Sequence, residues 1–324
     1  MAESLKTLVR LLANQIEPRS SGPLSTTSAG TSTTIVSTDL IFADGDETVY
    51  DGGWVYWPTG TLAGQQRPIG TSALDVTTGT LTVATPFSTT TPTATEFEIH
   101  LRYPVKRGAG TPTVGGLTEI INDTLRRLWY EDWISVTAVS GQLRYALDIT
   151  AYPWLTDTAR VLDVFSPADP TSSVRHPTTQ AWDIEDDAAA PTLVLADGFS
   201  TGPFFLKVAR PAWTSIKIAG VWTEVTQAAL NGGQAGLSAY SDETHAHADD
   251  VLALAITESM NHLGMKQPSM DKSLWEERRR YWADVAARCK FLRLPRRTRS
   301  RQGMRVAYAG GGLMGRGRTG RWWW

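Results

Sequence analysis

The segment closest to a known ligand-binding motif lies near the C-terminal end of the sequence. Residues 312–319 read GLMGRGRT and match the spacing G-x-x-x-x-G-[K/R]-T of a phosphate-binding loop, with Arg318 where Lys belongs. Such a loop holds phosphate because the helix that follows it points its N-terminus at the ligand. Only five residues follow Thr319, and three of them are Trp. We therefore expect no nucleotide or other cofactor site here.

A second pattern, THAHADD, offers His245, His247 and Asp249 as metal ligands. Two His residues one position apart can chelate a cation, but a closed zinc site needs a fourth ligand. Asp249 and Asp250 are also suited to cap the helix that the following residues predict. We favour a polar loop that enters a helix, and we expect no metal site.

Catalytic nucleophiles and acid–base pairs are weakly represented. The sequence has no G-x-S-x-G elbow, and Cys289 lies on a helical stripe, where a core position is expected. The pairs Asp186/Asp187 and Asp249/Asp250 are adjacent in loops, whereas glycosidases use two separated carboxylates. The sequence therefore predicts no catalytic residue and no enzyme.

Charge is distributed unevenly along the chain. Residues 290–324 contain ten of the 31 Lys and Arg residues and no Asp or Glu, so residues 1–289 carry 21 basic against 33 acidic residues. A basic tail on an acidic body needs a complementary surface, which nucleic acid, another copy of the body or a different protein would supply. The single Cys fits synthesis in a reducing cytoplasm, and no apolar run is long enough to span a membrane.

The tail could be an extended docking segment, a nucleic-acid arm or a disordered terminus. Arg with aromatic residues suits phosphates and stacked bases, but three exposed Trp residues on a free end would favour aggregation. Trp and Arg also dominate protein–protein hot spots, and Gly permits close approach of the backbone. We therefore favour docking. The predicted docking residues are Arg299, Arg301, Arg305, Tyr308, Arg316, Arg318, Arg321, Trp322, Trp323 and Trp324.

The elements that would position such a tail start with a helix in residues 1–18. Leu5, Leu8 and Leu12 share one helical face with Val9 and Ile16. A linker is expected over 19–32 from its Ser, Gly and Pro content, and a small β barrel or sandwich over 33–105. The strands expected in this domain are 33–38, 47–51, 54–58, the hairpin 73–85 around Thr78-Gly79, and 96–103.

The strand WVYWP carries bulky side chains on both faces. Trp54 and Tyr56 alternate with Val55 and Trp57. The strand is therefore either buried on both sides or in contact with a partner. As a partner surface, the strand would present Trp54, Tyr56 and Trp57 to another protein.

The rest of the chain predicts an α+β fold. Residues 106–248 contain a helix followed by a second β region, which reads as a sandwich with the helix packed across it. The apolar residues at helical spacing are Leu117, Ile120, Ile121, Leu125 and Leu128. A helical hairpin is expected over 249–294 and the extended tail over 295–324. The expected buried stripe of the last helix is Leu274, Tyr281, Val285, Cys289 and Leu292.

The stretch TLRRLWYEDWISV from Thr124, with the following GQLRYALD and ARVLDV, resembles the virion neck proteins of tailed bacteriophages. The order of a short helix, a Thr- and Gly-rich β domain, a terminal helix pair and a basic tail is similar to a head-to-tail adaptor, or connector, of a podovirus- or siphovirus-like phage. The turns ADGDETVYDGGWVYWPTG and TTGTLTVATPF look like small β modules of phage structural proteins.

This resemblance implies a homo-oligomeric ring, typically of twelve copies, beneath the portal protein. The C-terminal tail would insert into the portal, and the outer β domains would meet tail nozzle, tube or fibre proteins. Genomic DNA would pass through the lumen without specific binding, since an acidic channel repels phosphate. The protein would be made in the bacterial cytoplasm, reside in the virion neck or tail, and contact no membrane.

Three alternatives remain open at the level of sequence. The chain could be a tail nozzle, collar or fibre-attachment protein, because many adaptors are smaller and mainly helical. It could be a carbohydrate-binding tail protein that uses some of its 13 Trp residues. It could also be a DNA-binding protein that acts through the basic tail.

Overall fold

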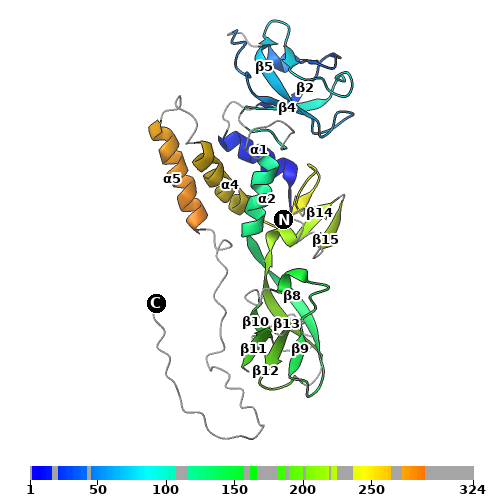
Figure 1. Ribbon diagram of the computed structural model, residues 1–324, viewed down its shortest axis with the longest axis vertical. Helices are drawn as coiled ribbons and strands as arrows, with labels where there is room; N and C mark the ends of the chain where they lie inside the picture. Colours follow the sequence, from blue (N-terminus) through cyan, green and yellow to red (C-terminus); the bar gives the residue numbers. More distant parts are fainter. Residues whose placement is uncertain are drawn as a thin grey trace.

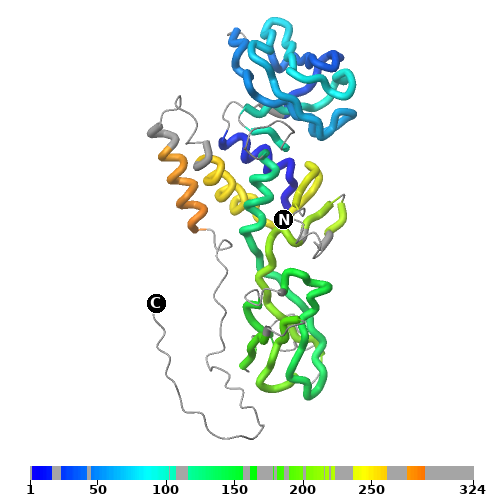
Figure 2. The backbone as a smooth tube through the Cα atoms, viewed as in Figure 1, coloured from blue at the N-terminus to red at the C-terminus, as the bar shows by residue number. Residues whose placement is uncertain are grey.

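The protein consists of three bodies arranged in a line, as the computed structural model shows (Figures 1 and 2). A β domain lies at one end, a helical body in the middle and a second group of strands at the other end. Helices and antiparallel sheets are both present, so the predicted α+β class is confirmed. The structure describes residues 2–16, 21–41, 45–101, 103–106, 116–156, 161–165, 178, 181–186, 190–199, 202–218, 220–224, 236–263 and 272–288.

The β domain is one six-stranded antiparallel sheet around its own apolar core. Val55, Trp57 and Phe97 are fully buried there. The predicted hairpin at Thr78-Gly79 is present, and Gly79 has a φ of +65°, which a residue with a Cβ rarely adopts. In sheet order the strands are β2 (Ser21–Ser25), β7 (Glu96–His100), β4 (Trp54–Tyr56), β5 (Gln66–Asp75), β6 (Thr80–Val83) and β3 (Thr34–Val36), with the short 3-10 helix η1 (Thr38–Leu40) after β3.

Two stretches of the β domain differ from their predicted structure. Ser21–Ser25, expected within the linker, forms edge strand β2 and pairs with β7. A bridge between Ser28 and Val36 then joins the chain after β2 to β3, so the sheet curls toward a closed barrel. Residues 47–51, expected as a strand, form turns around the buried Tyr50. At β2, pairing with β7 outweighs the linker-like local composition.

The helical body is built around one nearly all-buried helix, α4 (Ala248–Leu263), which packs against three other helices. The predicted apolar face of the first helix is confirmed, because Leu5, Leu8 and Leu12 are fully buried against this body together with Val9 and Ile16. Asp249 and Asp250 lie in the first turn of α4. The other helices are α1 (Leu5–Ile16), α2 (Leu117–Arg127) and α5 (Lys272–Arg288).

The helix α5 packs on α4 and faces solvent along its other side. Tyr281, expected on the buried stripe, is 62% exposed, and the neighbouring Trp282 packs against the core instead. A shift of one residue rotates a helical side chain by about 100°, so the stripe was assigned to the wrong position. Of its other predicted members, Val285 is half-buried. The side chain of Leu274 and the residues Cys289 and Leu292 lie outside the described part of the chain.

A small four-stranded sheet completes the helical body. Its order is β1 (Glu3–Ser4), β16 (Glu243–Thr244), β14 (Ser215–Ile218) and β15 (Val221–Glu224). The N-terminal strand β1 therefore pairs with a strand near the end of the described chain, and Glu3 lies opposite Thr244. This pairing fixes the start of α1 against the C-terminal half of the chain.

The third body, called here the sandwich, consists of two three-stranded sheets with one core between them. Phe204, Leu206 and Leu193 lie in this core with Tyr145 and Trp182. Short 3-10 helices follow at η2 (Pro153–Thr156) and η4 (Ala212–Thr214). The sheets are β10 (Val161–Phe165), β13 (Gly202–Pro211) and β8 (Trp129–Ala138), and β11 (Trp182–Asp186), β12 (Pro191–Leu195) and β9 (Arg144–Ala146).

The helix α2 does not pack across the sandwich as predicted. Its apolar residues Leu117, Ile121 and Leu125 lie in the core of the helical body, where α2 contacts α1 and α4. The prediction was wrong because adjacency in sequence suggested the following strands as the partner. The amphipathic faces of α1 and α4 supply a larger apolar surface for α2.

Candidate functional site: a polar joint between the β domain and the helical body

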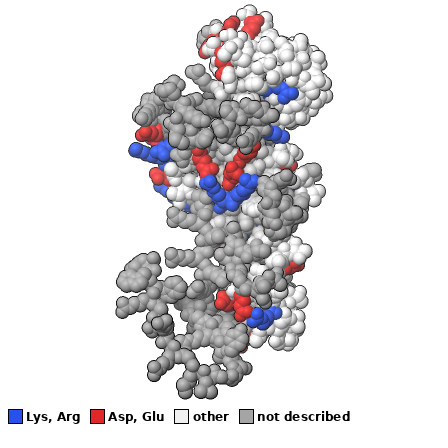
Figure 3. Space-filling model, viewed as in Figure 1, with Lys and Arg blue, Asp and Glu red and all other residues white. Residues whose placement is uncertain are grey.

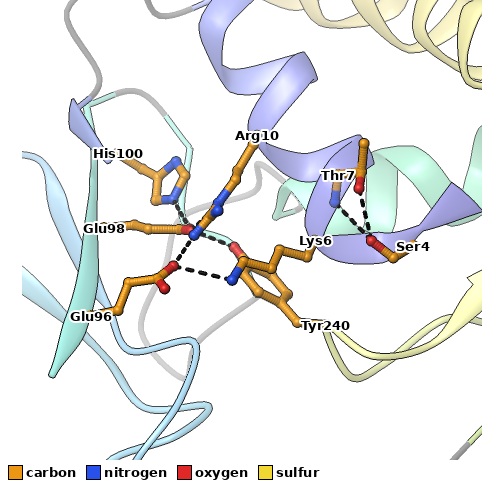
Figure 4. Close-up of polar contacts among 8 residues, drawn as sticks. All are labelled: Ser4, Lys6, Thr7, Arg10, Glu96, Glu98, His100 and Tyr240. Carbon is orange, nitrogen blue, oxygen red and sulfur yellow. Dashed lines mark hydrogen bonds and ion pairs between the residues drawn. The ribbon is translucent and has the colours of Figure 1, made fainter. Parts of the chain in front are cut away.

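A cluster of buried and half-buried charged groups lies where the β domain meets the helical body. Strand β7 alternates, so that Phe97 and Ile99 enter the core of the β domain while Glu96, Glu98 and His100 face α1. Figure 4 shows these three side chains directed at α1 and at Tyr240. The cluster of Lys6, Arg10, Glu96, Glu98, His100 and Tyr240 is called the polar joint below.

The helix α1 contributes two cations one turn apart. Lys6 and Arg10 are spaced i, i+4 and therefore lie on the same side of the helix. Nζ of Lys6 is 3.2 Å from Oε1 of Glu96, and Arg10 NH2 also bonds this oxygen. The apolar face of α1 enters the helical body, so its cationic side holds the β domain.

Glu98 is the centre of the polar joint, and its side chain is only 2% exposed. Its Oε1 accepts a hydrogen bond from Nε of Arg10 at 2.6 Å, and its Oε2 accepts one from the Tyr240 hydroxyl at 2.7 Å. Nε2 of His100 lies 3.2 Å from Oε2. Because a carboxylate can only accept, the imidazole donates from Nε2. Three donors from three segments thus converge on one buried carboxylate.

The surroundings of Glu98 decide its ionisation. Burial raises the pKa of the Glu98 carboxyl, but hydrogen bonds from His100, Tyr240 and Arg10 outweigh burial and hold this pKa below its ordinary value. Burial also works against the charge on Arg10, yet its bonds to the two glutamates keep the pKa of the guanidinium raised. Glu98 and Arg10 are therefore a charged pair at neutral pH.

Two tyrosines close the polar joint on the side of the helical body. The rings of Tyr56 and Tyr240 lie 4.9 Å apart, and both are buried. Burial and the nearby charge of Glu98 raise the pKa of Tyr56 to about 12 and raise the pKa of Tyr240 well above its ordinary range. Both phenols therefore stay protonated, and the Tyr240 hydroxyl remains a donor to Glu98.

A second attachment is formed by the chain that leaves the β domain. Tyr103 and Val105 are buried in the core of the helical body. The Tyr103 hydroxyl donates to the backbone carbonyl of Ser259 at 3.4 Å, and the Lys106 N–H donates to Oε1 of Gln66 at 3.0 Å. These contacts tether the β domain at one corner, beside the polar joint.

The sandwich is attached in a different way. Strands β8 and β13 pair without interruption from Gly202 opposite Ala138 to Pro211 opposite Trp129, and they rise toward α2 in Figure 1. Arg210, 7% exposed, donates from Nη1 to Oδ2 of Asp132 at 2.9 Å. Its guanidinium also lies over Tyr130 at 5.9 Å. This second connection is called the ladder joint below.

The chemistry of the polar joint suits attachment better than catalysis. Both oxygens of Glu98 are already occupied by donors, which leaves neither in position to take a proton from a substrate. The described residues contain no group of three or more His, Cys, Asp or Glu side chains that could hold a metal ion. The geometry thus defines a buried electrostatic contact between two bodies.

Of the predicted residues in and just after β4, Tyr56 lies at this same contact. Trp57 is fully buried in the core of the β domain, 5.8 Å from the Phe87 ring, and Tyr56 is buried against Tyr240. Trp54 is half-buried. Of the two interpretations of WVYWP, burial on both sides holds for Tyr56 and Trp57, so neither side chain is available to a tail protein.

The histidine pattern THAHADD forms no metal cluster with other described residues. His245 stacks on Trp222 at 3.7 Å with an interplanar angle of 9°. Partial burial and the charge of Arg210 lower the pKa of this imidazole. A neutral ring at neutral pH suits stacking, and His247 is exposed nearby.

The predicted docking residues of the tail fall outside the part of the chain that the structure describes, as do Arg318 and Thr319 of the phosphate-loop pattern. These docking residues are Arg299, Arg301, Arg305, Tyr308, Arg316, Arg318, Arg321, Trp322, Trp323 and Trp324.

Comparison with known proteins gives no relative. No protein-family model, curated protein or solved structure matches the chain. Within the described residues, no helix is both long and apolar enough to cross a membrane.

Sequence reasoning did not single out the residues of the polar joint. The signal was present in EFEIH, where charged and apolar residues alternate, but such alternation is also typical of a strand with one solvated face. The i, i+4 cations Lys6 and Arg10 were a second signal. Only the docking of α1 on β7 shows that these charges are complementary and buried.

Proposed function

We propose that the protein is a structural component of a tailed-bacteriophage virion, a head-to-tail adaptor without catalytic activity. The observation that carries this proposal is the linear arrangement of two β bodies on opposite ends of a helical body (Figure 1). Such a shape suits a subunit that links one assembly to another. The resemblance of the stretch from Thr124 to virion neck proteins is the reason for proposing a phage head-to-tail assembly.

In this proposal, copies of the chain form a ring beneath the portal protein. The helical body would brace the ring, and the β bodies would reach the tail nozzle, tube or fibre proteins. The basic tail over 295–324 would insert into the portal, where Arg side chains pair with acids and Trp side chains fill pockets. The protein would therefore act in the virion neck.

The charge of the chain agrees with a channel that DNA passes through. Residues 1–289 carry 21 basic against 33 acidic residues, so the body as a whole repels phosphate. On the face seen in Figure 3, Lys and Arg are sparse on the β domain, and the charges over the helices alternate in sign. Among the residues coloured on that face, Lys and Arg form no continuous patch.

Electron microscopy of the full-length chain mixed with its candidate portal tests the proposal. We expect rings seated on the portal, and we expect them to be weakened or lost when the chain is truncated after Pro295. A matched variant replaces only Trp322, Trp323 and Trp324 with Ala. It separates the contribution of the Trp side chains to portal binding from that of the Arg side chains. The proposal would be overturned if the chain stayed monomeric and did not bind the portal. Salt-dependent DNA binding that the truncation abolishes would favour the nucleic-acid alternative.

A further inference from the structure

The β domain meets the helical body through the polar joint and a small apolar contact that includes Tyr56, Tyr103 and Val105. Among the described residues, no strand of the six-stranded sheet packs extensively against a helix of the body. The connection instead consists of the polar joint, the Tyr56–Tyr240 contact and the corner around Tyr103. An attachment at one corner with a separate polar contact beside it has the geometry of a hinge with a latch.

We propose that the polar joint is a releasable latch. The β domain is closed on the helical body while Glu98 is ionised and bound by Arg10, Tyr240 and His100. It swings about the corner at Tyr103 when this carboxylate loses its charge or its partners. The latch is a property of the single chain and does not depend on the proposed virion function.

Buried charge makes the closed state conditional. A buried carboxylate is tolerated only when charged partners and hydrogen bonds replace its water. Glu98 meets this condition through donors from α1, from β7 and from the segment before β16. If its charge is removed, Arg10 keeps only the half-exposed Glu96 as a partner. Opening then lets water reach both groups. The open state therefore becomes more stable relative to the closed state.

The direction of the pH effect follows from the groups that face Glu98. Arg10 and Lys6 on α1 are cations, Glu96 and His100 share β7, and Tyr56 and Tyr240 stay protonated. The closed state lowers the pKa of Glu98, so the latch has its full strength above the ordinary glutamate pKa. It is lost as the pH falls through the lowered value.

Distances between spin labels on the full-length chain test the latch. Labels at Thr77→Cys in the β domain and Ala287→Cys on α5 report the angle between the two bodies, with Cys289→Ser to remove the native thiol. Labelled chain is diluted with unlabelled chain so that only distances within one subunit are measured. At neutral pH we expect one narrow distance for the parent chain. We expect a broad, shifted distribution for Glu98→Gln.

Glu185→Gln is the matched control, because Glu185 forms an exposed ion pair with Arg144 on the sandwich. It should leave the narrow distance unchanged. If Glu98→Gln does not fold, Tyr240→Phe, which removes one donor and no charge, should broaden the distribution as the pH is lowered, before the parent chain does. The latch is wrong if the distance between the labels stays narrow in Glu98→Gln, in Tyr240→Phe and at acid pH. Equal broadening by Glu185→Gln would overturn it as well.

Discussion

The polar joint and the ladder joint connect the same helical body to two β bodies by opposite means. At the ladder joint, β8 and β13 pair along ten residues each, and Leu128 and Ala212 at their end are already in the core of the helical body. At the polar joint, side chains from separate elements meet around Glu98. One connection is a continuous backbone ladder, and the other depends on ionisation.

The difference shows how one chain can hold a rigid and a conditional connection at once. Backbone hydrogen bonds of a sheet do not titrate between acid and neutral pH, and ten consecutive residue pairs hold β13 to β8. A buried charge cluster is stable only while every member keeps its partner. We therefore expect the sandwich to follow the helical body as a unit and the β domain to be the part that moves.

The largest expected effect comes from Arg10→Met. This substitution leaves the 2% exposed Glu98 without its cation, and loss of one partner from a buried pair costs about 3 kcal/mol. Urea denaturation followed by circular dichroism should show this loss of unfolding free energy. Arg10→Lys should recover part of it. An unchanged urea midpoint for Arg10→Met would mean that Glu98 is not stabilised by α1.

The corresponding change at the ladder joint is Arg210→Met, and its expected cost is about 2 kcal/mol. The effect is smaller because Asp132, its partner, is one-third exposed and can return to water. The stack of backbone pairs remains, so the distance between the sandwich and the helical body should not change. Spin labels at Ser140→Cys and Ala287→Cys would measure this distance. A broadened distribution would show that Arg210, rather than the ladder, fixes the sandwich.

Tyr240→Phe tests the polar joint through the pH at which it opens. It removes one neutral donor, which costs about 1 kcal/mol at neutral pH. With one donor fewer, the pKa of Glu98 in the closed state rises, so the latch should release at a higher pH than in the parent chain. The midpoint of opening on acid titration measures this shift. Tyr145→Phe in the sandwich, whose hydroxyl contacts Val139, is the control that should leave this midpoint unchanged.

The smallest effect is expected for Arg126→Ala. Its ion pair with Asp123 is exposed on α2, and such pairs contribute less than about 0.5 kcal/mol. The urea midpoint should therefore stay close to that of the parent chain. A loss as large as that of Arg10→Met would contradict the view that burial, rather than charge alone, gives the polar joint its strength.

Elements that follow from local periodicity were predictable from the sequence. The apolar face of α1 was predicted and is fully buried, and the hairpin at Gly79 was predicted from its turn. The strand β2 was missed because its Ser, Gly and Pro residues read as a linker, and only pairing with β7 orders them. The packing of α2 was misassigned because its partners α1 and α4 are distant in sequence.

The candidate site was less predictable than the fold. The charges of Glu96 and Glu98 read as a solvated strand face until the position of α1 is known. Tyr240 is 142 residues away from Glu98, and no local pattern joins them. The sequence showed that Tyr56 and Trp57 place large side chains on opposite faces of the strand. Which body each side chain enters depends on tertiary packing.

The most direct test compares both joints in the same chain during acid titration. One label pair, Thr77→Cys with Ala287→Cys, spans the polar joint, and the other, Ser140→Cys with Ala287→Cys, spans the ladder joint. Between roughly pH 7 and the onset of acid unfolding seen by circular dichroism, the first distance should broaden and the second should stay narrow. If both distances broaden together, or neither does, the contrast between a conditional and a fixed connection is wrong.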